Sequence, residues 1–255
     1  MRSLLLTLLA TSVLLTGCVN QRTVDGESEP APKFNPQEAA KSRLALGLQY
    51  LRSQNYRLAK ANLERARDYA PNDPAVHTGL AYYYQNVKDY ERAEQYYRSA
   101  IKLNPNDGDT LNNLAVLLCS QGKFKDALEY FHKAVEQPEY VKVASTWQNA
   151  ATCAMRQGDF DAANRYYQLA INHDPQNSTI LESYAGLLLR QQRYIDAQRV
   201  LAQRAQLPQF TPQYLWLEIQ LARALGNQAK ALTYGELLMS RFPQSEQAQR
   251  FLKNS

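Results

Sequence analysis

The sequence predicts an all-α protein, a right-handed solenoid of six helix-turn-helix repeats that ends in a short capping helix. The first observation is an alanine that recurs every 34 residues, with one interval of 36, at Ala59, Ala93, Ala127, Ala163, Ala197 and Ala231. The second is a proline that closes each repeat, at Pro71, Pro105, Pro138, Pro175, Pro208 and Pro243. Proline lacks an amide donor and disfavours helix in the residue before it. One such unit cannot bury its apolar face alone, so neighbouring units must stack.

Each repeat is expected to contain two antiparallel helices, as in "AVHTGLAYYYQNV" (75–87) and "YERAEQYYRSAIKL" (90–103). A small residue lies twelve positions before the recurring alanine in five repeats, at Gly47, Ala81, Ala115, Ala151 and Ala185. Small residues let two helices approach closely, and large aromatic side chains such as Tyr97 and Tyr167 fill the remaining space. We expect the six repeats to span residues 37–244 and the capping helix to lie within residues 245–255.

The N-terminal segment is an apolar run over residues 4–15 that is shorter than the roughly 20 residues of a membrane-spanning helix. It is typical of a secretory signal peptide, expected here over residues 1–17. "LTGC" (15–18) resembles the bacterial lipobox, which implies cleavage before Cys18 and acylation of that cysteine. In the Gram-negative lipoproteins that this segment resembles, aspartate after the cysteine favours the inner membrane, so Val19 implies the periplasmic face of the outer membrane. The alternative is an ordinary signal peptide that happens to contain a cysteine.

Residues 18–36 differ in composition from the repeats, with three prolines and few large apolar side chains. Such a segment buries too little surface to offset its ordering entropy. We expect a flexible tether that reaches at most about 60 Å from the lipid.

The repeat pattern resembles the tetratricopeptide repeat. This resemblance implies that the first helix of each unit lines a groove that binds a protein or peptide. The groove positions on this basis include Leu44, Leu48, Leu51, Tyr82, Gln85, Asn112, Asn113 and Asn149. The three leucines form an apolar stripe at the open N-terminal end, which either docks a partner or packs against its own second helix or the tether. The asparagines either bind a peptide backbone or cap helices.

Two cysteines remain after Cys18, namely Cys119 and Cys153, and they lie on the first helices of neighbouring units. Side chains that face each other there can come within bridging distance, and the periplasm is oxidising. A disulfide is the favoured interpretation, and two buried free thiols are the alternative.

The composition favours a binding protein over an enzyme. Basic and acidic residues are mixed along the chain at a net charge of +5, with no basic block for nucleic acid. The three histidines match no metal spacing, and no glycine-rich phosphate loop or nucleophile motif is present. We therefore expect no catalytic residues, metal, cofactor or small-molecule substrate.

The chain further resembles the type IV pilus biogenesis lipoproteins called pilotins. The resemblance is carried by "LTGC", by "RLALGLQYLRSQNYRLAKANLERA" (43–66), by "LNNLAVLLCSQGKFKDALEYFHKAV" (111–135), by "PEY" (138–140) and by "QNAATCAMRQGDFDAANRYYQLAI" (148–171). It implies a partner, the pilus secretin, whose outer-membrane localisation and multimerisation the protein would promote for twitching motility. The alternative is a scaffold lipoprotein for other envelope machinery, such as outer-membrane protein assembly or peptidoglycan enzymes.

Overall fold

The computed structural model describes residues 23–24, 27–28 and 33–253, which belong to two units, residues 1–35 and 36–255. The expected signal peptide and the expected acylation site, Cys18, lie outside the described residues. In the first unit, strands β1 (Thr23–Val24) and β2 (Glu27–Ser28) pair in antiparallel register. These strands are the described part of the expected tether, together with residues 33–36.

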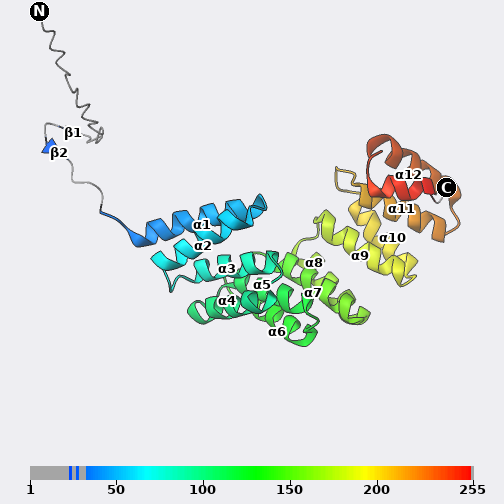
Figure 1. Cartoon of the computed structure of the whole chain (residues 1–255). Coiled ribbons are helices and arrows are strands. Elements are labelled where there is room, and N and C mark those ends of the chain that lie inside the picture. The colour runs from blue at the N-terminus through cyan, green and yellow to red at the C-terminus, as the bar shows by residue number, and fades with distance from the viewer. Residues whose placement is uncertain (1–22, 25–26, 29–32, 254–255) are drawn as a thin grey trace, which may run out of the picture. The chain divides into compact units, whose positions relative to one another are not determined.

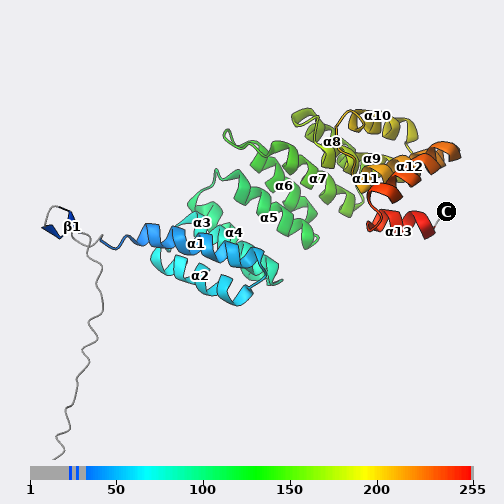
Figure 2. The same cartoon turned by 90° about the horizontal axis from the view of Figure 1, so that it is seen from above.

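The second unit is a row of helix pairs, so the predicted all-α solenoid of six repeats is confirmed (Figures 1 and 2). The pairs are α1 (Pro36–Arg52) with α2 (Tyr56–Tyr69), α3 (Pro74–Asn86) with α4 (Tyr90–Leu103), α5 (Gly108–Ser120) with α6 (Phe124–Val135), α7 (Val143–Gln157) with α8 (Phe160–His173), α9 (Ser178–Arg190) with α10 (Tyr194–Arg204), and α11 (Pro212–Ala224) with α12 (Gln228–Arg241). The terminal helix α13 (Glu246–Lys253) packs on α11 and α12.

Polar side chains cap the N-termini of many of these helices, and a left-handed residue reverses the chain inside each pair. Side chains that accept a backbone N–H at a helix N-terminus belong to Asn55, Asp73, Asp89, Asp107, Asp159, Asn177, Thr211 and Asn227. The turn inside every pair contains one residue with positive φ, namely Gln54, Lys88, Gly122, Gly158, Gln192 and Gly226. The same left-handed turn therefore reverses the chain in all six repeats, and three of them use glycine, which adopts this conformation without strain.

The core runs along the middle of the row. The six recurring alanines are all buried, at no more than 2% exposure. Tyr97 and Tyr167 are buried as well, which confirms their role as packing residues between helices. Repeat five departs from the pattern, because Arg204 stands seven residues after its recurring alanine, where the first four repeats have Ala66, Ala100, Ala134 and Ala170. This arginine is buried and is the largest fully buried side chain of the described core.

Candidate functional site

The first helices of the repeats line one face of the array, here called the first-helix face, and a hollow of about 530 Å³ lies at its N-terminal end. Its walls come from α1, α3 and α5, through Leu44, Leu48, Arg52, Ala75, Thr78, Gly79, Tyr82, Asp107 and Asn113. Four of the predicted groove residues are among them: Leu44, Leu48, Tyr82 and Asn113. The hollow is the place where the structure brings the predicted site together.

The apolar wall of this hollow follows from the spacing of two leucines. Leu44 and Leu48 are four residues apart, so they lie on the same side of α1. Both are half-buried. Gly79 on α3 allows α1 to approach, because a Cβ there would lie 2.6 Å from Cδ1 of Leu44. Tyr82 adds an aromatic ring that is 43% exposed, so its face is available to a partner.

Leu51 is buried and does not line the predicted groove. Its side chain is only 4% exposed and belongs to the hydrophobic core. Since α1 packs against both α2 and α3, the last turn of this helix is covered by its own array. The prediction that Leu51 lines the groove is wrong, and the alternative of packing against the second helix describes it better.

Gln85 also does not line the hollow, because its side chain bonds to a buried tyrosine. Its Oε1 accepts a hydrogen bond from the hydroxyl of Tyr97 at 3.0 Å. Burial raises the pKa of that hydroxyl, so it stays protonated and keeps donating. Gln85 therefore satisfies a buried tyrosine, which sequence spacing alone did not reveal.

The predicted amides of the next units are brought into contact with each other. Nδ2 of Asn149 on α7 donates to Oδ1 of Asn112 on α5 at 3.1 Å, and Thr146 donates to the same oxygen at 3.3 Å. One unit further on, Gln148 donates to Oγ of Ser183 at 3.3 Å. These side chains form a polar ladder across the first-helix face. Each amide keeps further donor or acceptor capacity for a peptide backbone.

A disulfide joins Cys119 on α5 to Cys153 on α7, with the Cα atoms 5.8 Å apart. This separation lies within the normal range for a disulfide. The bond ties the first helices of units three and four directly beside the amide ladder.

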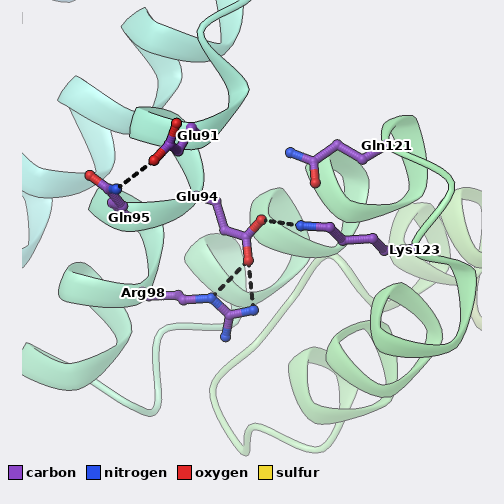
Figure 3. Close-up of a pocket in the computed structure, with 6 residues that line it drawn as sticks. All are labelled: Glu91, Glu94, Gln95, Arg98, Gln121 and Lys123. Atoms are coloured by element: carbon purple, nitrogen blue, oxygen red, sulfur yellow. Dashed lines mark hydrogen bonds and ion pairs between the residues drawn. The ribbon is translucent and has the colours of Figure 1, made fainter.

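A charged hollow lies between α4 and the turn that precedes α6 (Figure 3). Glu94 is held there by Arg98 at 2.8 Å and by Lys123 of the next repeat at 2.7 Å. Burial raises the pKa of Glu94, but the hydrogen bonds from Lys123 and Arg98 outweigh it and keep that pKa below its ordinary value of 4.5. Because these charges satisfy one another, we interpret the ion pairs as a structural link between repeats two and three.

A second hollow on the first-helix face, of about 360 Å³, lies between α7, α9, α11 and α13 and was not predicted from the sequence. Its lining includes Met155, Gly186, Arg190, Gln213, Trp216 and Leu217. A glycine in the middle of an otherwise regular first helix was the available signal in the sequence.

Among the described residues, no group of three or more His, Cys, Asp or Glu side chains is placed to hold a metal ion. No helix in the same part of the chain has the length and apolar character needed to cross a membrane.

Comparison with known proteins identifies the repeat. Models of the tetratricopeptide repeat match residues 74–107, 106–176 and 154–217, which together cover more than half of the chain. An uncharacterized protein of Haemophilus influenzae is 42% identical over 127 residues, which are 50% of this chain and 71% of that protein. The type IV pilus assembly protein PilF of Pseudomonas aeruginosa is 26% identical over 251 residues, which are 98% of this chain and 97% of PilF.

Solved structures agree with this assignment. The structure of Pseudomonas aeruginosa PilF superposes with a TM-score of 0.70 at 23% identity, over 87% of this chain and 100% of that one. The structure of PilW, described as a widely conserved type IV pilus biogenesis factor, superposes with a TM-score of 0.71 at 27% identity, over 84% of this chain and 98% of PilW. The chain therefore belongs to the tetratricopeptide repeat family and is homologous to the type IV pilus proteins PilF and PilW.

Proposed function

We propose that the protein is a lipid-anchored helper of type IV pilus biogenesis. It binds subunits of the pilus secretin on its first-helix face and promotes their localisation and multimerisation in the outer membrane. The observation that carries this proposal is the apolar hollow between α1, α3 and α5, in a chain that is similar to PilF over 98% of its length. The role is binding rather than catalysis.

The chemistry of the hollow supports a polypeptide partner. Leu44 and Leu48 offer an apolar wall, and Tyr82 offers an exposed ring. Arg52 and Asn113 stand at the same hollow with polar groups. Grooves that combine apolar anchors with a few polar groups are suited to an amphipathic helix or an apolar peptide.

The N-terminal sequence supports the anchor. Acylation at the end of the lipobox-like segment, at Cys18, would put acyl chains at the start of the mature protein. Several acyl chains hold a protein firmly, at about 0.8 kcal/mol per buried methylene. Acylation at Cys18 would place the array on the periplasmic face of the outer membrane, where secretin rings assemble.

Leu48→Glu tests the binding site. Leu48 lines the hollow and is only half-buried, so a carboxylate there should leave the array folded while it removes apolar contact area. We expect capture of the secretin from detergent-solubilised outer membranes to fall at least about tenfold. Gln49→Glu is the matched control, since Gln49 is exposed on the same helix and does not line the hollow. Equal capture by wild type and Leu48→Glu would exclude this hollow.

Cys18→Ala tests the transport role. We expect the variant to remain folded, as judged by circular dichroism, but to be released from the membrane. Secretin multimers should then be lost from the outer membrane, and twitching motility should stop. If the multimers still form there, the protein does not deliver secretin subunits, whatever the result with Leu48→Glu.

A further inference from the structure

The second hollow, between α7, α9, α11 and α13, has no part in the function proposed above. We propose that it is a separate subsite for an acidic linear segment of a polypeptide. An apolar side chain of that segment enters above Gly186, and a neighbouring Asp or Glu side chain pairs with Arg190. This inference does not depend on the partner being the secretin.

The glycine at the floor of the hollow is not required by helix packing. A Cβ on Gly186 would meet only Cδ2 of Leu217, at 3.6 Å, which is ordinary van der Waals contact. At Gly47, by contrast, a Cβ would lie 2.7 Å from Cγ of Leu63, so that glycine is needed for close approach. Glycine inside a helix is less favourable than alanine. What Gly186 provides is open space beside Leu217.

The apolar side chains of the hollow come from two different helices. Met155 projects from α7, whereas Trp216 and Leu217 project from α11. Trp216 is 9% exposed, so its ring forms a firm wall that is reachable from the hollow. A tryptophan wall beside an unfilled glycine position suits a single inserted aliphatic or aromatic side chain.

The charge around the hollow selects an acidic partner. Arg190 lines it, is exposed, and donates a long hydrogen bond to Sδ of Met155 at 3.9 Å. Arg156 stands at the equivalent position one repeat earlier and contacts the backbone oxygen of Ser120 at 3.4 Å. Neither guanidinium forms an ion pair with a carboxylate of the described chain, and each carries five donors that match a carboxylate.

The carboxylates near the hollow do not cancel this positive charge. Glu182 is buried, and its Oε1 accepts from Nε of Arg204 at 2.7 Å and from Thr211 at 2.8 Å. Its charge is therefore already neutralised by a buried arginine. Glu246 pairs with Arg250 at 2.7 Å on α13. Among the described residues that line the hollow, Arg190 is the cation without a carboxylate partner, so an acidic group completes the site.

The apolar floor and the cation together favour an acidic peptide segment over a free anion or a neutral peptide. A free anion would use Arg190 alone and would leave the space over Gly186 empty. A neutral apolar peptide would leave the guanidinium without a partner. A chain segment that alternates acidic and apolar residues uses both features.

The test uses the full chain in detergent micelles and a fluorescein-labelled peptide, acetylated and amidated, in which Glu alternates with Leu and Phe. Fluorescence anisotropy should show binding that weakens at least about tenfold when every Glu of the peptide is replaced by Gln. Arg190→Gln should weaken binding of the acidic peptide to the same extent. Arg165→Gln removes the same charge from an exposed position on α8 and should bind like wild type.

Two further measurements place the peptide. The chain has two tryptophans, so Trp147→Phe leaves Trp216 as the only indole, and its emission should change when the acidic peptide binds. Gly186→Met fills the hollow and should abolish binding, whereas Leu48→Glu should not affect it. If Gly186→Met fails to fold, the affinity of Arg190→Gln for the peptide and the emission of Trp216 still test the proposal.

Three results would overturn the proposal. These are equal binding of the Glu and Gln peptides, equal losses for Arg190→Gln and Arg165→Gln, and unchanged Trp216 emission on binding. A Gln peptide with a free C-terminus that binds as tightly as the acidic peptide would assign the site to a chain terminus and would also contradict it.

Discussion

Arg204 donates through Nε to Oε1 of Glu182 at 2.7 Å, and both side chains are buried, at 1% and 7% exposure. Arg204 also donates to the backbone oxygen of Gln209 at 2.7 Å. Glu182 accepts in addition from Thr211, the residue that caps α11. This ion pair therefore fastens repeat five to the segment that leads into repeat six.

Removal of one partner should destabilise the array strongly. We expect Arg204→Ala to lower the free energy of unfolding by about 3–5 kcal/mol, because it leaves the buried carboxylate of Glu182 without its cation. Urea denaturation followed by circular dichroism measures this. The double variant Arg204→Met/Glu182→Leu should recover most of the loss, since it removes both charges. A double variant no more stable than the single one would contradict this account.

The disulfide should stabilise the array by restricting the unfolded chain. The cysteines are 34 residues apart, and a loop of this length corresponds to about 3–4 kcal/mol. We expect Cys119→Ala/Cys153→Ala to lose this amount, and either single alanine variant to lose nearly as much. Addition of a reductant should destabilise the wild type but not the double variant. Equal effects of reductant on both would rule out a contribution from the bond.

Glu94 should make stability depend on pH in the acid range. Its pKa in the folded protein lies below the ordinary value of 4.5, so its contribution is present above that value and is lost as the pH falls through the folded pKa. Glu94→Gln should therefore be less stable than wild type at neutral pH, and the difference should shrink below about pH 4.5. Denaturation at a series of pH values measures the difference, and one that stays constant down to low pH would contradict the prediction.

Two glycines should respond oppositely to alanine. Gly186→Ala should stabilise the protein by about 0.5–1 kcal/mol, because the added Cβ has room and alanine favours helix. Gly47→Ala should destabilise it by about 1–3 kcal/mol, because the Cβ meets Leu63 and the backbone oxygen of Ala59. Thermal melts of the two variants against wild type distinguish these signs. Stabilisation in both would mean that the packing around Gly47 yields easily.

The regular spacing of small residues was sufficient to predict most of the fold. Ala59 and its equivalents are buried in every repeat, because a close approach of two helices permits only small side chains there. Less of the candidate site could be predicted from the sequence. Position within a repeat predicted Leu44 and Leu48 at the hollow, but it could not show that Leu51 is covered by α2 and α3.

The remaining differences come from side chains that satisfy buried polar groups. Gln85 accepts a hydrogen bond from Tyr97, which lies on the second helix of the repeat. The position of Gln85 within its own helix does not indicate this partner. Arg204 interrupts the alanine pattern, and this irregularity was the visible sign of a buried ion pair. Its partner, Glu182, could not be identified without the fold, since twenty-two residues of chain separate the two.

The covalent tie between α5 and α7 also has a mechanical meaning. Each unit of a solenoid touches only its neighbours, so the array bends by small rotations summed over its joints. A bond across the central joint restricts rotation there and leaves bending to the joints on either side. The hollow at α1, α3 and α5 lies before this stiffened joint, and the hollow at α7, α9, α11 and α13 lies after it. The disulfide therefore limits how far the two hollows can rotate relative to each other.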